Sequence, residues 1–182
     1  LNPTNVYGAS KATQEMLAMA YHHSYGLPVT ILRSSTIIGL GMRRSQVIPI
    51  FLTQALKGEP LTIHGDGSQT RDFNPVENHV DAIVETLTRP EVSGRIINVG
   101  SGEERSILSV AEDCLRATGS KSTIAFLEWR PGEAGLRVML DIRRARDLLG
   151  YRPEVSFGEA LGRMCAWLAK ELNMEKVLAS HR

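Results

Sequence analysis

Tyr7 and Lys11 are the residues whose types and spacing most directly suggest chemistry. They are four positions apart, so on a helix they share one face. A tyrosine with its ordinary pKa of about 10 is a poor base at neutral pH. A nearby ammonium favours the phenolate, which can then take a proton from a hydroxyl group as hydride leaves the adjacent carbon. The small residues between them, Gly8, Ala9 and Ser10, would let a ligand or a partner helix approach closely. The alternative is a helix that contains both residues by chance.

A helix must hold this pair, and the sequence supplies signals for both of its ends. Thr4 or Asn5 can cap a helix that starts near Val6. Gly26 followed by Pro28 is a typical stop. Farther along the chain, apolar β-branched runs alternate with segments of helical periodicity. We predict strands at residues 29–32, 61–64, 95–99 and 123–127, and helices at 47–56, 80–87, 107–117, 142–149 and 157–172. The first strand is apolar without alternation, which predicts burial on both of its faces.

Strands that alternate with helices indicate an α/β protein. A dinucleotide-binding sheet would begin with a glycine-rich turn between a strand and a helix. The one candidate, residues 98–105, follows a predicted strand and precedes a predicted helix. However, Arg105 occupies the third glycine position, and Glu103 and Glu104 stand where a pyrophosphate would lie. We therefore interpret this segment as a plain strand-to-helix turn.

The composition argues against several classes of protein. Of the 182 residues, 42% are hydrophobic and 23% are charged, which is ordinary for a globular protein, and the net charge is +1. This balance does not favour nucleic acid or a membrane surface as a partner, and we expect neither a membrane span nor a signal peptide. Cys114 and Cys165 match no metal spacing, so we expect idle thiols in a cytoplasmic protein, with a disulfide left open. Because the chain starts at Leu1, we expect a processing, cloning or truncation point there.

Five segments, in order, resemble the extended short-chain dehydrogenase/reductase family. They are residues 7–11 preceded by Pro3, 26–33, 58–73, 98–102, and 130–133 leading to Asp141. Within that family the chain is most similar to NAD-dependent nucleotide-sugar epimerases and dehydratases of the UDP-glucose 4-epimerase type. The resemblance implies the C-terminal part of a Rossmann-type parallel sheet plus a small mixed α/β substrate-binding domain. Residues 1–40 would hold the active-site helix and the following Rossmann strand. Residues 41–182 would form mainly the substrate domain, with a return strand near 95–99.

The resemblance also implies roles for single residues. Tyr7 would be the catalytic acid/base, Lys11 would tune it, and both would contact NAD at its nicotinamide ribose. Arg71 and Arg130 match the two arginines that hold the diphosphate of a UDP- or dTDP-sugar, and a guanidinium group suits phosphate oxygens. The resemblance implies no metal.

Three further positions complete the predicted substrate site. Glu133 matches an acidic residue near the nucleotide ribose, and His64 matches an aromatic position beside the base. Thr36 stands where the family has an asparagine that helps to hold the diphosphate, and Ile38 replaces a tyrosine two residues later.

The glycine-rich NAD loop, the catalytic Ser or Thr and the first strands of the family would lie upstream of residue 1. We therefore expect a truncated C-terminal portion that does not bind NAD on its own, although NAD serves the full-length family. Three readings stay open: an epimerase or dehydratase that passes hydride transiently to NAD, a module that binds a nucleotide sugar or a partner protein without catalysis, and a proteolytic core. Met16, Met19 and Ala20 on the active-site helix favour a homodimer through that helix.

Overall fold

The computed structural model describes residues 3, 5–130, 132 and 134–180, the last seven as backbone, and it has the α/β architecture that the sequence predicts. The helices are α1 (Val6–Tyr25), α2 (Val47–Lys57), α3 (Val76–Thr88), α4 (Ile107–Thr118), α5 (Arg143–Leu149) and α6 (Phe157–Ser180), with a 3-10 turn η1 (Pro90–Val92). The strands are β1 (Ile31–Ser34), β2 (Thr36–Ile38), β3 (Leu61–His64), β4 (Thr70–Arg71), β5 (Phe73–Pro75), β6 (Ile96–Val99), β7 (Arg105–Ser106) and β8 (Ile124–Leu127).

Helix α1 begins and ends where the local chemistry requires. The side chain of Asn5 accepts a hydrogen bond of 2.7 Å from the amide of Gly8, which identifies Asn5 as the cap. Gly26 adopts a left-handed backbone with φ 68°, and its N–H donates to His22 O at 2.9 Å. This start places Tyr7 and Lys11 in the first two turns of the helix.

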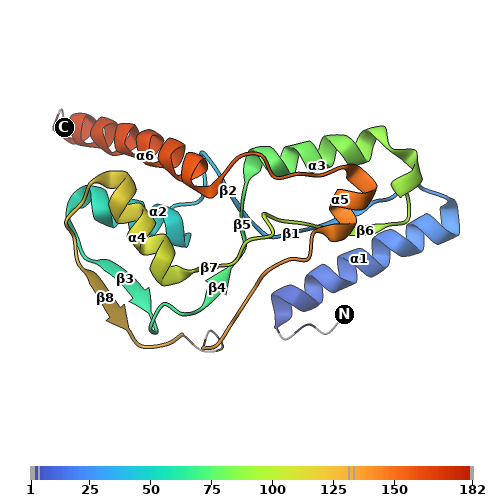
Figure 1. Cartoon of the computed structure of the whole chain (residues 1–182), viewed down its shortest axis with the longest axis horizontal. Coiled ribbons are helices and arrows are strands. Elements are labelled where there is room, and N and C mark those ends of the chain that lie inside the picture. Colours follow the sequence, from blue (N-terminus) through green and yellow to red (C-terminus); the bar gives the residue numbers. More distant parts are fainter. Residues whose placement is uncertain (1–2, 4, 131, 133, 181–182) are drawn as a thin grey trace.

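Among the described residues the strands form four pairs, of which three are parallel. β1 pairs with β6, β2 with β5 and β3 with β8 in parallel, whereas β4 pairs with β7 in the antiparallel direction. In Figure 1 the β1–β6 pair runs between α1 on one side and α3 and α5 on the other. The other half of the molecule is built by α2, α4 and α6, which pack on one another, with α2 and α4 also packing on β3.

Two separate hydrophobic cores follow this division. The larger core fills the space between α2, α4, α6 and β3, and its buried large side chains include Ile48, Phe51, Leu52, Phe73, Met164 and Leu168. The smaller core lies beside β6, where Ile97 and Val99 contact side chains of α3, η1 and α5 and the ring of Tyr151. The smaller core thus joins residues 76–99, which end with β6, to residues 140–151. The division of the chain at residue 40 stays a prediction.

Some predicted elements differ from the observed ones. The first strand runs over Ile31–Ser34, two residues later than predicted, and it is half-buried, so the prediction of burial on both faces is wrong. Among the described residues β1 pairs with one strand, β6, which leaves its other edge without a strand neighbour and its residues partly exposed. Helix α3 begins at Val76, four residues earlier than predicted, directly after Pro75. The strands β2, β4, β5 and β7 were not predicted, because two or three residues carry no readable periodicity.

Within the part of the chain that the structure describes, no helix combines the length and the apolar character that crossing a membrane requires.

Candidate functional site

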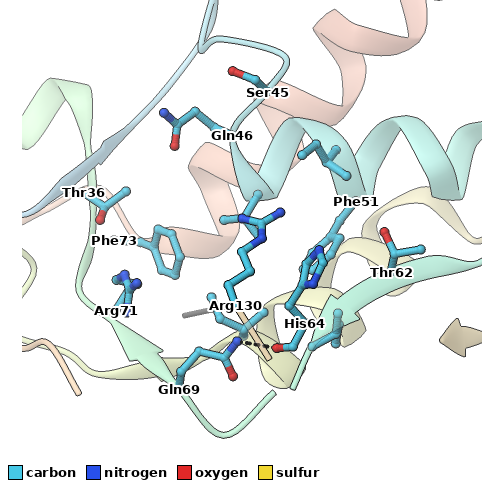
Figure 2. A pocket seen from close by; sticks show the side chains of 14 residues that line it. Thr36, Ser45, Gln46, Phe51, Thr62, His64, Gln69, Arg71, Phe73 and Arg130 are labelled. Atoms are coloured by element: carbon cyan, nitrogen blue, oxygen red, sulfur yellow. Dashed lines mark hydrogen bonds between the residues drawn. The ribbon is translucent and has the colours of Figure 1, made fainter. Parts of the chain in front are cut away.

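A cavity of about 240 Å³ gathers four of the five predicted substrate residues. Thr36, His64, Arg71 and Arg130 all line it; Glu133 lies outside the described residues. The wall is completed by residues of α2, β3 and β5, of the segments next to them and of the start of α4, namely Ser45, Gln46, Val47, Ile50, Phe51, Thr62, Ile63, Gln69, Phe73 and Ile107. Figure 2 shows Thr36, Arg71 and Phe73 on one side, Thr62 and His64 on the other, and Arg130 between them.

Strand β3 provides one wall through its alternation. Leu61 and Ile63 are buried in the larger core, so Thr62 and His64 lie on the opposite face of the strand. A hydrogen bond of 3.0 Å between His64 Nδ1 and Glu128 O holds the imidazole beside the segment that follows β8. The ring therefore lies between the end of β3 and the segment that carries Arg130.

The two arginines reach the cavity from different elements. Arg71 belongs to β4 and donates from Nη1 to the carbonyl oxygen of Thr70 at 2.9 Å, and Arg130 follows β8. Among the described residues, neither guanidinium forms an ion pair with a carboxylate. Two uncompensated guanidinium groups at one cavity favour an anionic ligand with several oxygen atoms, such as a diphosphate.

Tyr7 and Lys11 line a second cavity, of about 450 Å³, between α1 and β1. The ammonium of Lys11 lies 5.8 Å from the centroid of the Tyr7 ring and donates to Gln14 Oε1 at 3.2 Å. The Tyr7 side chain is 72% exposed. The two predicted catalytic residues are therefore together and accessible, at a different cavity from the one that Thr36, His64, Arg71 and Arg130 line.

An ion pair that the sequence analysis missed holds α1 against β1. Both guanidinium nitrogens Nε and Nη2 of Arg33 donate to the carboxylate of Glu15, at 2.9 and 2.6 Å. The hydrogen bonds from Arg33 lower the pKa of Glu15. Because Glu15 stands one turn after Lys11, this pair fixes the part of α1 that carries Lys11 and Tyr7. Glu15 and Arg33 are 18 positions apart, so no local spacing in the sequence signals this pair.

The glycine-rich turn after β6 binds a carboxylate of the chain itself. The amide of Ser101 donates to Asp72 Oδ1 at 2.8 Å, the Ser101 hydroxyl donates to the same oxygen at 2.8 Å, and the amide of Gly102 donates to Oδ2 at 3.4 Å. These are the donors that a phosphate would need at such a turn. Because Asp72 already occupies these donors, the turn does not fit the pyrophosphate of NAD. Tyr7 and Lys11, the residues predicted to contact the nicotinamide ribose, line an open cavity.

Asn78 is a second residue with a structural role. It is buried in α3, donates to Val155 O at 2.9 Å and accepts from the amides of Glu154 and Val155 at 3.1 and 2.9 Å. It thereby holds the segment before α6 against α3.

Among the described residues no group of three or more His, Cys, Asp or Glu side chains could hold a metal ion. Cys114 and Cys165 are free thiols, which settles the disulfide left open above, and burial raises the pKa of both.

Comparison with known proteins identifies the family. Residues 1–100 match the family model described as the NAD dependent epimerase/dehydratase family. An uncharacterized UDP-glucose epimerase, YtcB of Bacillus subtilis, is 35% identical over 169 residues, which are 93% of this chain and 53% of that protein. A dTDP-glucose 4,6-dehydratase of Xanthomonas campestris is 34% identical over 175 residues, covering 91% of this chain and 49% of the relative.

Solved structures agree with the sequence comparison. The epimerase Mth375 of Methanothermobacter thermautotrophicus superimposes with a TM-score of 0.90 at 31% identity, over 97% of this chain and 53% of that one. UDP-glucuronic acid 4-epimerase of Bacillus cereus, in complex with UDP-glucuronic acid and NAD, gives a TM-score of 0.86 at 34% identity, over 94% and 54% of the two chains. The chain thus spans about half the length of the relatives it matches. It belongs to the NAD-dependent epimerase/dehydratase family.

Proposed function

We propose that this chain supplies the nucleotide-sugar site and the Tyr–Lys pair of an NAD-dependent epimerase or dehydratase acting on a UDP- or dTDP-sugar. The observation that carries this proposal is the cavity that gathers Arg71 and Arg130, both without a carboxylate partner among the described residues, beside His64 and Thr36. In this role the two guanidinium groups bind the diphosphate, His64 lies beside the base, and the Thr36 hydroxyl donates to a phosphate oxygen. We assign Glu133 to the nucleotide ribose.

In the proposed reaction Tyr7 handles the proton. NAD, when bound, supplies the site that accepts a hydride from a sugar carbon and returns it. The Tyr7 phenolate takes the proton of the adjacent sugar hydroxyl, and the ammonium of Lys11 favours the phenolate form. The open cavity beside α1 leaves the Tyr7 oxygen accessible to a sugar ring.

We further propose that residues 1–182 alone do not bind NAD with ordinary affinity. Recognition of its pyrophosphate depends on free backbone N–H groups at a glycine-rich turn. The turn after β6 already donates those groups to Asp72. Micromolar binding of NAD to this chain in a calorimetric titration would contradict this proposal.

A second candidate function is a module that binds the nucleotide sugar without catalysis. It is favoured by the separation of the two cavities, because the substrate residues do not need the Tyr7 cavity in order to bind a nucleotide. Replacing Tyr7 by Phe separates the two functions. If the protein is an enzyme, Tyr7→Phe abolishes turnover and leaves the nucleotide affinity unchanged. If it is a binding module, it has no turnover to lose, and Tyr7→Phe leaves its nucleotide affinity unchanged.

The experiment that tests the site is a calorimetric titration with UDP, dTDP and their glucose conjugates. We expect Arg71→Ala and Arg130→Ala to weaken binding roughly ten- to hundredfold, since each charge-assisted contact contributes about 1.5–3 kcal/mol. Arg116→Ala, on the exposed side of α4, removes an equal charge away from the cavity and serves as the control. Thr36→Asn should strengthen binding. Arginine variants that bind like the wild type, or a wild type that binds none of these ligands, would refute the nucleotide-sugar site.

We also propose that the chain forms a homodimer through α1. Apolar side chains on this helix are exposed, including Met16 at 60% and Leu17 at 59%, and Tyr21 extends the same surface. An exposed apolar surface of this kind favours association. A wild-type chain that sediments as a monomer, or a Met16→Lys variant that remains a dimer, would contradict a dimer through this helix.

A further inference from the structure

Asp72 is a fully buried carboxylate beside the proposed diphosphate site. Its neighbours in the chain, Arg71 and Phe73, both line the cavity. Four donors bind it: the amide and the hydroxyl of Ser101 at 2.8 Å each on Oδ1, and the amides of Gly102 at 3.4 Å and Leu140 at 3.3 Å on Oδ2. All four are neutral. The carboxylate therefore joins three segments that are distant in the sequence.

The segment that contains Leu140 runs beside β4. Thr70 N–H donates to Leu136 O at 3.0 Å, Val138 N–H donates to Thr70 Oγ1 at 3.3 Å, and Leu140 N–H reaches Asp72. Every second residue from 136 to 140 is thus bonded to residues 70–72. In Figure 1 the chain leaves β8 and passes β4 on its way to α5. This returning segment also carries Arg130, six residues before Leu136.

A second carboxylate, that of Glu104, holds the same segment. Glu104 accepts a hydrogen bond from the hydroxyl of Thr70 and is paired with Arg137, whose Nε and Nη2 lie 2.8 and 2.5 Å from the two carboxylate oxygens. Glu104 and Asp72 therefore anchor residues 136–140 at both ends of β4.

We propose that Asp72 is a positioning residue for the diphosphate site. It fixes the strand of Arg71 against the segment of Arg130 and thereby sets the separation of the two guanidinium groups. This inference rests on the proposed function of the two arginines. Asp72 itself is buried beneath the cavity wall and does not contact the ligand.

The distribution of donors explains why a carboxylate is required. Asparagine has one acceptor oxygen, and its amide group carries two hydrogens. Because Oδ1 accepts the two shorter bonds, the oxygen of an asparagine would stay on the side of Ser101. Its NH₂ group would then face the N–H groups of Gly102 and Leu140, where donor meets donor. Asp72→Asn should therefore release Leu140 while keeping the turn after β6.

The experiment combines hydrogen exchange with UDP titration on the wild type, Asp72→Asn, Arg130→Ala and the double variant. We expect faster amide exchange over residues 136–141 in Asp72→Asn. UDP should bind about two- to tenfold more weakly, the equivalent of one lost hydrogen bond. In the double variant the additional loss caused by Arg130→Ala should shrink, since Arg130 is already displaced.

Tyr151→Phe is the matched control. The Tyr151 hydroxyl is buried and lies 2.9 Å from Gly100 O and 3.3 Å from Asn74 Oδ1. Its loss therefore disturbs the turn after β6 and strand β5 without removing a hydrogen bond of residues 136–140. It should lower the melting temperature and leave UDP affinity unchanged. Glu104→Gln, at the more accessible end of the segment, gives a second test that leaves the buried core intact, with a smaller change in the same direction.

Unchanged exchange over residues 136–141 in Asp72→Asn overturns the inference, whether or not UDP binds. The inference is also overturned if Asp72→Asn and Glu104→Gln both bind UDP with wild-type affinity. It is likewise overturned if the losses of UDP affinity caused by Asp72→Asn and Arg130→Ala are fully additive in the double variant. If Tyr151→Phe weakens UDP binding as much as Asp72→Asn does, then Asp72 only stabilises the fold. A wild type that binds no UDP refutes the proposed function instead, and the exchange result then decides by itself whether Asp72 holds the segment.

Discussion

Gly100 is expected to tolerate no side chain, because the Asp72 carboxylate occupies the space where a Cβ would be. A Cβ built there would overlap Asp72 Oδ2 and would lie 3.1 Å from its Cγ. Gly100 has an ordinary φ, so the effect of Gly100→Ala would be steric rather than conformational. The carboxylate cannot retreat freely, since Ser101 holds Oδ1 with two bonds of 2.8 Å.

The magnitude follows from these contacts. Relieving the overlap requires a shift of roughly half an ångström or more, which weakens at least one of the hydrogen bonds to Asp72. Overpacking a well-packed core costs about 1–3 kcal/mol, and a weakened hydrogen bond costs about 1 kcal/mol more. We therefore expect Gly100→Ala to lower the free energy of unfolding by about 2–4 kcal/mol.

Urea denaturation, followed by far-UV circular dichroism, measures this loss. Gly162→Ala is the matched control, because Gly162 lies inside α6 with an ordinary φ and open space around its Cα. There alanine should be neutral or stabilising by up to about 1 kcal/mol. In an Asp72→Ala background the cost of Gly100→Ala should largely disappear. The same cost in both backgrounds, or a cost at Gly100 no larger than at Gly162, would refute the steric reasoning.

Three other predictions concern stability. Met164→Ala, at a core position that is 1% exposed, should lower the free energy of unfolding by about 2–5 kcal/mol in urea, and an unchanged midpoint would contradict this packing. Burial lowers the pKa of His79 below 6.5, so its neutral ring contributes stability above pH 6.5 that is lost as pH falls through the folded pKa. His79→Gln should flatten that dependence in thermal melts, and an unchanged profile would contradict it. The hydrogen bonds from Arg137 and Thr70 lower the pKa of Glu104 from 4.5 to about 2, so its contribution is complete above pH 4.5 and is lost toward pH 2. Glu104→Gln should remove that acid-side slope, and a variant that keeps the slope would exclude Glu104 as its source.

Much of the secondary structure could be predicted because its causes are local. The Asn5 cap and the left-handed Gly26 delimit α1, and Gly58 and Gly119 end α2 and α4 in the same way. The strand predicted before the Gly65-Asp66-Gly67 turn has the observed bounds of β3. Each of these features depends on residues within a few positions of one another, so the printed sequence contains the whole physical reason.

The candidate site was predictable in its membership rather than in its arrangement. The family motifs named Thr36, His64, Arg71 and Arg130, and the structure brings all four to one cavity. No spacing in the sequence could show that they line a different cavity from Tyr7 and Lys11, because that separation depends on how α1 packs on β1.

The tertiary structure alone decided the short strands and the part played by Asp72. β4 is two residues long and exists because Thr70 and Arg71 pair with Ser106 and Arg105, more than thirty positions away. The donors to Asp72 come from residues 101, 102 and 140, so its sequence neighbours reveal nothing of them. The sequence by itself determined which helices and motifs form. Which buried carboxylate holds the two arginine segments together depended on contacts that only the folded chain creates, since a buried charge must find its donors wherever the fold brings them.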